Sequence, residues 1–207
     1  MGIHGLMALA WLAAAPVGDS QVVAGKRVGA IDSKSSEAEL KRTLGTAAVR
    51  TEDSGWAGAD EGSSGKATAV FPDSPDRLLI VWSDPAKRTQ PRLIVIGDKP
   101  KNKFTASRWK TPEGIGPGTT LEEVEKINGA PFFLEPLGSD EGGNAFFEQG
   151  KLSAGRAPII NFEPEVEPEK LSEADQAKLN ALKDWKSDNA TVRRLKLRVA
   201  TMVVELK

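Results

Sequence analysis

The sequence contains no cysteine, no tyrosine and a single histidine, His4. Without cysteine the chain forms no disulfide and offers no thiolate as a nucleophile or a ligand. His4 lies in an N-terminal segment that we expect to be removed, so we expect the mature chain to lack imidazole as well. These absences exclude Ser-His-Asp and Cys-His catalysis and zinc sites, which use histidine or thiolate ligands. We expect no metal and no cofactor.

The sequence also lacks an excess of charge of either sign. Its 207 residues include 28 lysines and arginines against 29 aspartates and glutamates, for a net charge of -1. Such a balance gives no field that would attract nucleic acid or an anionic membrane, and we expect no nucleic-acid partner. The length suffices for one domain, or two small ones packed together, with a core that needs no disulfide. We expect a monomer.

Only one apolar run is long, Leu6 to Ala15 (LMALAWLAAA), and Pro16 and small residues follow it. This pattern is typical of a secretory signal peptide and is too short for a membrane span of ~20 residues. We predict a signal peptide at residues 1–24, cleaved before Gly25, and therefore a periplasmic or secreted protein. The segment before the run has no lysine or arginine, which leaves a buried N-terminal helix as the alternative.

An internal repeat relates residues 35–45 (SSEAELKRTLG) to residues 119–129 (TTLEEVEKING). Each copy has a hydroxyl residue three positions before a glutamate, which is the capping-box pattern of a helix start. Each copy ends on a glycine, which suits a left-handed helix C-cap. We therefore predict two short helices. The expected caps are Ser36 and Thr120 at the starts, with Glu39 and Glu123 as their partners, and Gly45 and Gly129 at the ends.

Strand-like apolar runs follow each predicted helix. They lie at 66–71, 77–82, 92–96 and around 104–110 in the first half, and at 144–148 and 158–162 in the second. An acidic, proline-rich connector at 161–170 leads to the last elements. These are a helix at 171–185, a helical turn over 188–195 capped by Asp188, and an alternating closing strand at 197–206.

The fold class that these elements predict is α+β. We expect two repeated helix-plus-antiparallel-meander units packed around a shared core. The first unit would span 25–111, and the second would span 112–207 and include the connector and the C-terminal helix and strand. The polar segment 51–65 is predicted to be a long loop, which is either disordered or functional.

Three strings in the chain carry a resemblance: VWSDP at 81–85, RWKTPEGI at 108–115 and GTTLEEVEKINGAPF at 118–132. They are similar to W-x-D-P, R-W-x-T-x-x-G-I and G-T-x-L-x-E-L-E-x-L-N-G-x-P-F in a group of uncharacterised exported bacterial proteins. The similarity covers most of the chain after the first helix and implies export and architecture. Residues 136–143 lack the Trp and Tyr pattern expected after P-F. The tandem unit also resembles outer-membrane assembly lipoproteins and tandem-repeat β-lactamase inhibitor proteins, which implies a binding role.

Three glycines at alternate positions, Gly114, Gly116 and Gly118, precede the second predicted helix. They do not form a phosphate-binding P-loop, because Thr119 and Thr120 follow without the lysine that the motif needs, and the spacing of a dinucleotide fingerprint is also missing. The N-terminus of a helix can still bind an anion. Gly118, Thr119 and Thr120 are therefore a candidate anion site, and a flexible lead-in to a capped helix is the alternative.

Short strings also resemble the S-x-x-K, S-D-N and K-T-G motifs of penicillin-recognising enzymes: Ser63 to Lys66, Ser187 to Asn189 and Lys110-Thr111. Their order is wrong, and Pro112 stands where the last motif has glycine. The match to these enzymes is therefore poor. A hydrolase that uses a Ser-Lys pair or paired carboxylates is kept as an alternative function. It requires those groups to lie together in a cleft.

Acidic residues gather in two predicted loops, at Asp53, Asp60 and Glu61 and at Asp140 and Glu141. Carboxylates of this kind can bind calcium, but the EF-hand spacing is absent. Solvated turns are the simpler interpretation, so we assign no metal to them. Asp140 and Glu141 are retained as candidate binding residues.

Tryptophan and arginine are the residues most enriched at binding hot spots. Candidates lie at strand ends and in the polar segment 51–65, whose only large apolar side chain is a tryptophan. They are Trp56, Trp82, Asp84, Arg108 and Trp109. The alternative for the strand tryptophans is packing in the core.

We expect a non-catalytic exported binding module that contacts a protein or another component of the cell envelope. A duplicated scaffold without recognisable catalytic residues favours this function. The alternatives are the hydrolase and a purely structural module, and the structural module predicts no exposed tryptophan or apolar patch.

Overall fold

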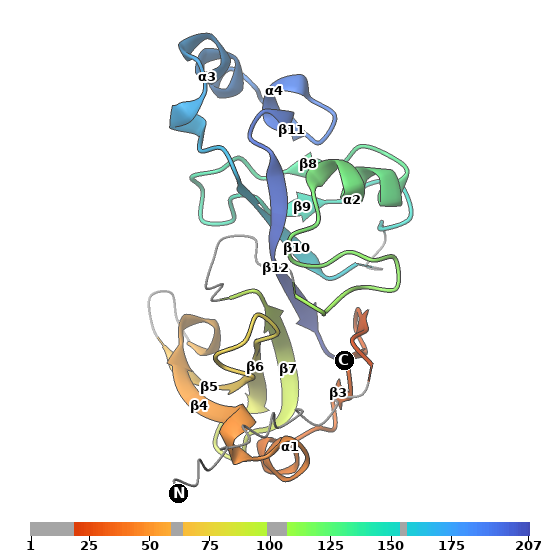
Figure 1. The fold of residues 1–207 in the computed structure, drawn as a ribbon, viewed down its shortest axis with the longest axis vertical. Helices are drawn as coiled ribbons and strands as arrows, with labels where there is room; N and C mark the ends of the chain where they lie inside the picture. The colour runs from red at the N-terminus through yellow and green to blue at the C-terminus, as the bar shows by residue number, and fades with distance from the viewer. Residues whose placement is uncertain (1–18, 59–63, 99–106, 154–156) are drawn as a thin grey trace, which may run out of the picture.

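A six-stranded antiparallel sheet organises the molecule (Figure 1). A computed structural model describes residues 19–58, 64–98, 107–153 and 157–207. The strand order is β10-β12-β7-β6-β5-β4. The strands are β4 (Val49–Ser54), β5 (Gly65–Val70), β6 (Leu78–Asp84), β7 (Thr89–Ile96), β10 (Ile159–Pro164) and β12 (Leu197–Glu205).

The C-terminal strand β12 lies between strands from the two halves of the chain. It pairs with β7 through Val203↔Val95 and with β10 through Val203↔Ile159. Figure 1 shows β12 running along the long axis of the molecule. The predicted closing strand and the α+β class are confirmed, and the sheet is shared between the halves.

The second half does not repeat the meander of the first. It contributes β10 and β12 to the large sheet, and its other strands form a small sheet of order β11-β8-β9. These strands are β8 (Phe133–Leu134), β9 (Ala145–Phe146) and β11 (Trp185–Lys186). A third sheet holds β1 (Val22–Val23), β2 (Arg27–Val28) and β3 (Ile31–Asp32). The similarity between the halves is clearest in their capped helices.

Helices α1 (Glu37–Leu44) and α2 (Leu121–Asn128) form where the capping pattern predicts them. Thr120 and Glu123 make a complete capping box at α2, and Gly129 adopts the left-handed conformation. Gly45, at the end of α1, has φ 86° and ψ 150°, so the prediction of a left-handed C-cap is wrong there. The positive φ still suits glycine.

Two C-terminal predictions need correction. Helix α3 (Glu173–Asn180) ends before the predicted residue 185, because Trp185 pairs with Leu134 as part of β11. Helix α4 (Ala190–Arg193) is capped by Asn189, whose side chain accepts the N–H groups of Thr191 and Val192, and not by Asp188. None of the helices in the described ranges combines the length and apolar composition needed to cross a membrane.

Two expectations for the first half also need correction. Residues 51–54, predicted as loop, belong to β4. This edge strand is mostly polar, so its sequence lacks the alternation of apolar and polar residues that usually predicts a strand. The strand expected around 104–110 lies partly outside the described residues, and Lys110 makes only an isolated bridge to Gln21. Short 3₁₀ turns complete the chain at η1 (Thr46–Ala48), η2 (Gly55–Ala57) and η3 (Pro168–Lys170).

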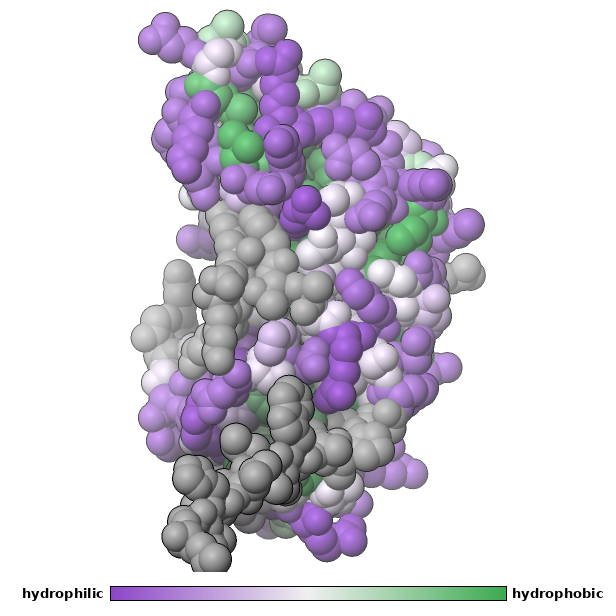
Figure 2. Space-filling model, viewed as in Figure 1, coloured by the Kyte–Doolittle hydropathy of each residue, from purple (hydrophilic) through white to green (hydrophobic). Residues whose placement is uncertain are grey.

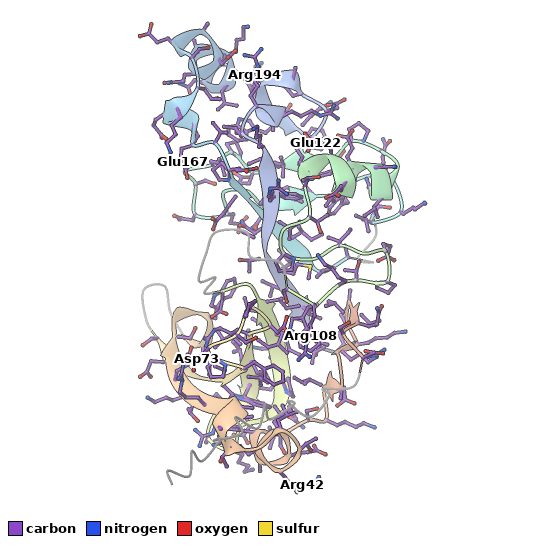
Figure 3. All side chains as sticks on the ribbon, in the orientation of Figure 1. Arg42, Asp73, Arg108, Glu122, Glu167 and Arg194 are labelled. Carbon is purple, nitrogen blue, oxygen red and sulfur yellow. The ribbon has the colours of Figure 1, made fainter. Side chains whose placement is uncertain are left out.

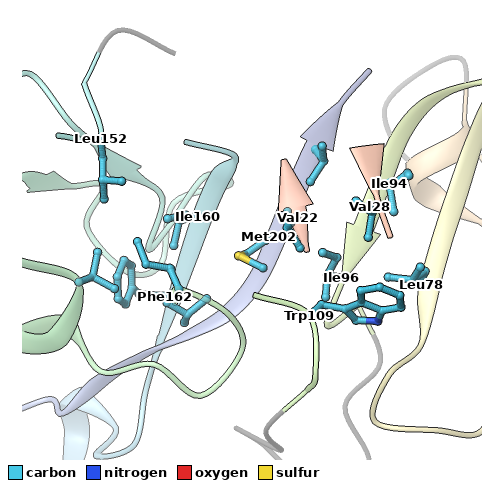
Figure 4. Close-up of a cluster of buried hydrophobic side chains, with 14 of the residues drawn as sticks. Val22, Val28, Leu78, Ile94, Ile96, Trp109, Leu152, Ile160, Phe162 and Met202 are labelled. Atoms are coloured by element: carbon cyan, nitrogen blue, oxygen red, sulfur yellow. The ribbon is translucent and has the colours of Figure 1, made fainter. Parts of the chain in front are cut away.

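One main hydrophobic core contains side chains from both halves of the chain. Figure 4 shows Met202 of β12 between Ile160 and Phe162 on one side and Ile96 and Trp109 on the other. Val22 is fully buried in this core, and its N–H donates to the carbonyl oxygen of Lys110 at 2.8 Å. Cleavage before Gly25 would therefore remove a core side chain together with β1.

A buried carboxylate attaches α1 to the large sheet. Glu37 accepts hydrogen bonds from Thr68 Oγ1 and Lys41 Nζ, both at 2.5 Å, and pairs with Arg88 Nε at 3.0 Å. Thr68 Oγ1 in turn accepts the indole N–H of Trp82 at 2.8 Å. Burial by itself would raise the pKa of Glu37, but these hydrogen bonds and the two cations outweigh it and lower the pKa.

We predict that Glu37→Gln lowers the free energy of unfolding by about 2 kcal/mol, because it removes hydrogen bonds to a buried charge. Since the pKa of Glu37 is lower in the folded chain, the stability it adds is complete above its ordinary pKa and is lost as the pH falls through the folded value. Urea unfolding should therefore show a weaker acid dependence in the variant. The exposed Glu39→Gln on the same helix should change stability by less than about 0.5 kcal/mol, and equal effects of the two substitutions would contradict the account.

Candidate functional site

An open groove of about 1030 Å³ lies over the small β11-β8-β9 sheet and the start of β10. Three further cavities lined by described residues have volumes of about 730, 460 and 280 Å³. Figure 2 shows that hydrophilic residues cover most of the face in view and that hydrophobic side chains emerge only in small patches. An exposed apolar surface in a groove therefore stands out from its surroundings.

Two exposed apolar side chains line this groove. Phe146 on β9 is 45% exposed and Ile159 at the start of β10 is 46% exposed. Among the described residues only Trp56 is comparable as a large exposed hydrophobic side chain. Buried Leu134, Leu152 and Trp185 form the base beneath them. The base belongs to the core, so it gives these two side chains a packed support.

The rim of the groove is acidic. Among the described residues that line it, the charged ones are Glu135, Glu141, Glu148, Asp184 and Lys183, four carboxylates against one amine. Glu141, predicted from sequence as a binding residue, is thus part of the rim. The neighbouring Asp140 is exposed on the same turn but does not line the groove.

Hydrogen bonds fix the acidic turn against β10. The Phe162 N–H donates to the carbonyl oxygen of Gly143 at 2.8 Å, and the Asn161 amide donates to that of Gly142 at 2.7 Å. Gly143 has φ 85°, and a Cβ there would lie 2.0 Å from the Phe162 carbonyl oxygen. Only glycine fits this close approach, so the turn that carries Glu141 is held in one position.

The predicted binding roles of Trp82 and Trp109 are wrong, because both rings are buried in the core. The indole N–H of Trp82 donates to Thr68, and that of Trp109 donates to the carbonyl oxygen of Asp76 at 2.8 Å. Internal acceptors of this kind allow tryptophan to be buried. Sequence alone could not tell that both rings face the core.

The remaining predicted residues of the first half do not gather into a site. Arg108 lies over the rings of Phe71 and Trp109, at 5.0 and 4.9 Å from their centroids, which is a packing role. Asp84 accepts the Lys87 N–H at 3.0 Å in a turn, and this hydrogen bond lowers the pKa of Asp84. Trp56 is 44% exposed beside β4, at the opposite edge of the sheet from β10.

The Ser-Lys alternative finds no support in the described residues. Ser63 lies outside them, and Lys66 forms an ion pair with Asp53 at 2.8 Å. Ser187 is fully buried, donates to Glu125 at 2.5 Å and accepts the Phe132 N–H at 3.0 Å. A hydroxyl held in this way has no access to a substrate.

One pair of largely buried carboxylates does occur, Glu52 and Asp98, and Arg77 lies between them. Its guanidinium donates to Asp98 Oδ1 at 3.0 Å and also bonds Glu52. Burial alone would lower the pKa of Arg77, but the two carboxylates outweigh it and raise the pKa. Both carboxylates accept hydrogen bonds from the same guanidinium, and this contact favours their ionised forms. Neither is therefore suited to act as a proton donor. In the described parts of the chain no group of acidic or histidine side chains could hold a metal ion.

At the predicted anion site, the backbone N–H groups of Gly118, Thr119 and Thr120 are already engaged. Their N–H groups donate to the carbonyl oxygens of Val199 and Gly116 and to the Glu123 carboxylate, at 2.8, 3.0 and 2.8 Å respectively. The Glu123 side chain already occupies the helix N-terminus, so the donors expected to bind an anion have partners within the protein.

Comparison with known proteins gives no assignment. No protein-family model matches the chain, and neither a curated protein nor a solved structure matches it. The inference of function therefore rests on the geometry of the groove.

We predict that truncating two neighbouring residues of β10 lowers the free energy of unfolding by very different amounts. Ile159→Ala should change the free energy of unfolding by less than about 1 kcal/mol, because the side chain is half exposed. Ile160→Ala should cost about 2–5 kcal/mol, because that side chain is fully buried. Urea unfolding measures both, and a large cost at Ile159 would mean that its side chain supports the fold and is not free for a partner.

Proposed function

We propose that the protein is a non-catalytic binding module whose groove takes an extended peptide segment with alternating apolar and basic side chains. The observation that carries this proposal is the pair of half-exposed side chains, Phe146 and Ile159, inside an acidic rim. We further propose an exported monomer whose partner is a protein of the cell envelope. The N-terminal apolar run and the resemblance to exported proteins support that location.

The apolar part of the groove supplies the affinity. Phe146 and Ile159 expose nearly half of their surfaces, and covering them would contribute on the order of 1 kcal/mol each. An apolar pair of this kind suits one or two anchor side chains of a partner. A purely structural module would have no need of such exposure.

The acidic rim supplies the selectivity. Glu135, Glu141, Glu148 and Asp184 outnumber Lys183, so a segment with lysine or arginine is attracted and an acidic segment is repelled. Because the rim is open to solvent, its contribution is screened by salt.

The first residues of β10 offer a backbone edge for an extended segment. On its outer side β10 meets the turn at Asn144 and Gly143, which bond Asn161 and Phe162. Ile159 and Ile160 lie beyond this contact, and no strand in the described residues pairs with their outer side. A peptide could add here as a strand and place alternate side chains over the groove.

Selection from a peptide library tests the proposal directly. We predict enrichment of segments that alternate lysine or arginine with phenylalanine, leucine or isoleucine. In a fluorescence-polarisation assay, Phe146→Ser combined with Ile159→Ser should weaken the selected peptide at least tenfold. Trp56→Ser, at the other edge of the sheet, is the matched control and should have no effect. Equal affinity for the double variant would place binding elsewhere.

A charge substitution tests the rim separately. We predict that Glu148→Lys weakens the peptide several-fold, mainly through slower association, and that raising NaCl from 50 to 500 mM removes most of the difference. Glu122→Lys on α2 (Figure 3) changes the charge by the same amount on an exposed residue away from the groove. Similar effects of both substitutions would show that total charge, and not the rim, attracts the peptide.

A further inference from the structure

A second pocket, of about 730 Å³, lies where the segment before α2 meets α2 and the start of β12. Three cationic side chains from these three parts line it: Lys110, Lys126 and Arg198. Glu123 is the one carboxylate among its lining residues. The pocket is therefore basic, in contrast to the acidic groove.

Lys110 is partly buried in this pocket without a carboxylate to pair with. Its Nζ donates to the carbonyl oxygen of Pro117 at 3.3 Å, and no ion pair with another described residue forms within 4.0 Å. Burial lowers the pKa of Lys110, and the more distant charge of Glu123 opposes that shift only in part. A partly desolvated cation without a counter-ion is costly, and an anion in the pocket would offset that cost.

A glycine leaves the space that this lysine occupies. A Cβ on Gly116 would lie 2.2 Å from the backbone carbonyl oxygen of Trp109, which requires glycine here, and 2.6 Å from Lys110 Cδ. Because Gly116 has no side chain, the lysine can lie across it and direct its ammonium group toward Pro117 at the pocket wall. The middle of the three alternate glycines thus has a defined structural purpose.

Two hydrogen bonds orient the Arg198 guanidinium, and part of it still has N–H groups that can donate to a ligand. Its Nη1 donates to the carbonyl oxygen of Gly118 and its Nε to Glu165, both at 3.2 Å. Its Nη2 group has no partner in the described part of the chain. Lys126 on α2 is exposed and has no side-chain partner there either.

Glu123 offsets only one of the three positive charges of the described lining, and its carboxylate is engaged in the helix cap. It accepts the Thr120 N–H at 2.8 Å and the Thr120 hydroxyl at 2.9 Å. Those hydrogen bonds, with help from the charges of Arg198 and Lys110, lower its pKa. The lining therefore has two positive charges in excess.

We propose that this pocket binds a small-molecule oxyanion, a carboxylate or a phosphate, through the side chains of Lys110, Lys126 and Arg198. The backbone N–H groups of Gly118, Thr119 and Thr120 take no part, since they have internal partners. Pro117 and Ile127 in the lining would contact a small apolar body attached to the anion. The site is independent of the acidic groove in both residues and charge.

NMR titration of the whole protein with sodium phosphate, sodium acetate and sodium chloride at matched ionic strength tests this site. We expect saturable shifts of the amides of Gly114, Gly118 and Thr119 with phosphate or acetate and none with chloride, and the stronger of the two identifies the class of anion. Lys110→Gln should weaken binding at least tenfold. Lys34→Gln, an exposed lysine outside the pocket, should not change it.

A second variant tests the same site in case Lys110→Gln disturbs the fold. Glu123→Gln retains a residue that can complete the capping box but removes the competing negative charge. We expect it to tighten binding several-fold. Shifts that do not saturate, equal shifts with chloride, or an affinity unchanged by Glu123→Gln would each overturn the proposal.

Discussion

The pairing of β12 with β7 and β10 is the interaction on which the rest of the structure depends. Residues more than 100 positions apart in the chain, such as Val95 and Val203, become neighbours through it. Met202 and Val204 of β12 are buried in a core that both halves share. Without this strand β7 and β10 would each present an open edge, and the core would divide.

The groove and the basic pocket both contain residues of β12 or residues paired with it. Val203 pairs with Ile159 at the acidic groove, and Arg198, near the start of β12, reaches the basic pocket beside α2. The two surfaces differ in sign of charge, and the ligands that we propose for them differ accordingly: a cationic peptide segment for the groove and a small oxyanion for the pocket. A single strand therefore contributes to both of the proposed recognition surfaces.

Local patterns predicted much of the fold, whereas contacts between distant segments were beyond them. The helices at Ser36 and Thr120 follow from capping residues three positions apart, and β6 and β12 follow from apolar runs. The edge strand β4 was missed because its residues are polar, and the shared sheet was missed because its pairing is non-local. For the proposed groove site, the sequence singled out Glu141, whereas Phe146 and Ile159 resemble ordinary strand residues in sequence. Their exposure depends on how the small sheet packs against β10.

Native-state hydrogen exchange of the backbone amides tests the central role of β12 most directly. If β12 joins the two halves, amides in β7, β10 and β12 should exchange through one opening reaction with the free energy of global unfolding. Their exchange should rise together in low urea. If amides in β10 opened at a clearly lower free energy than those in β7, the halves would be separate folding units, and the account of a shared core would be contradicted.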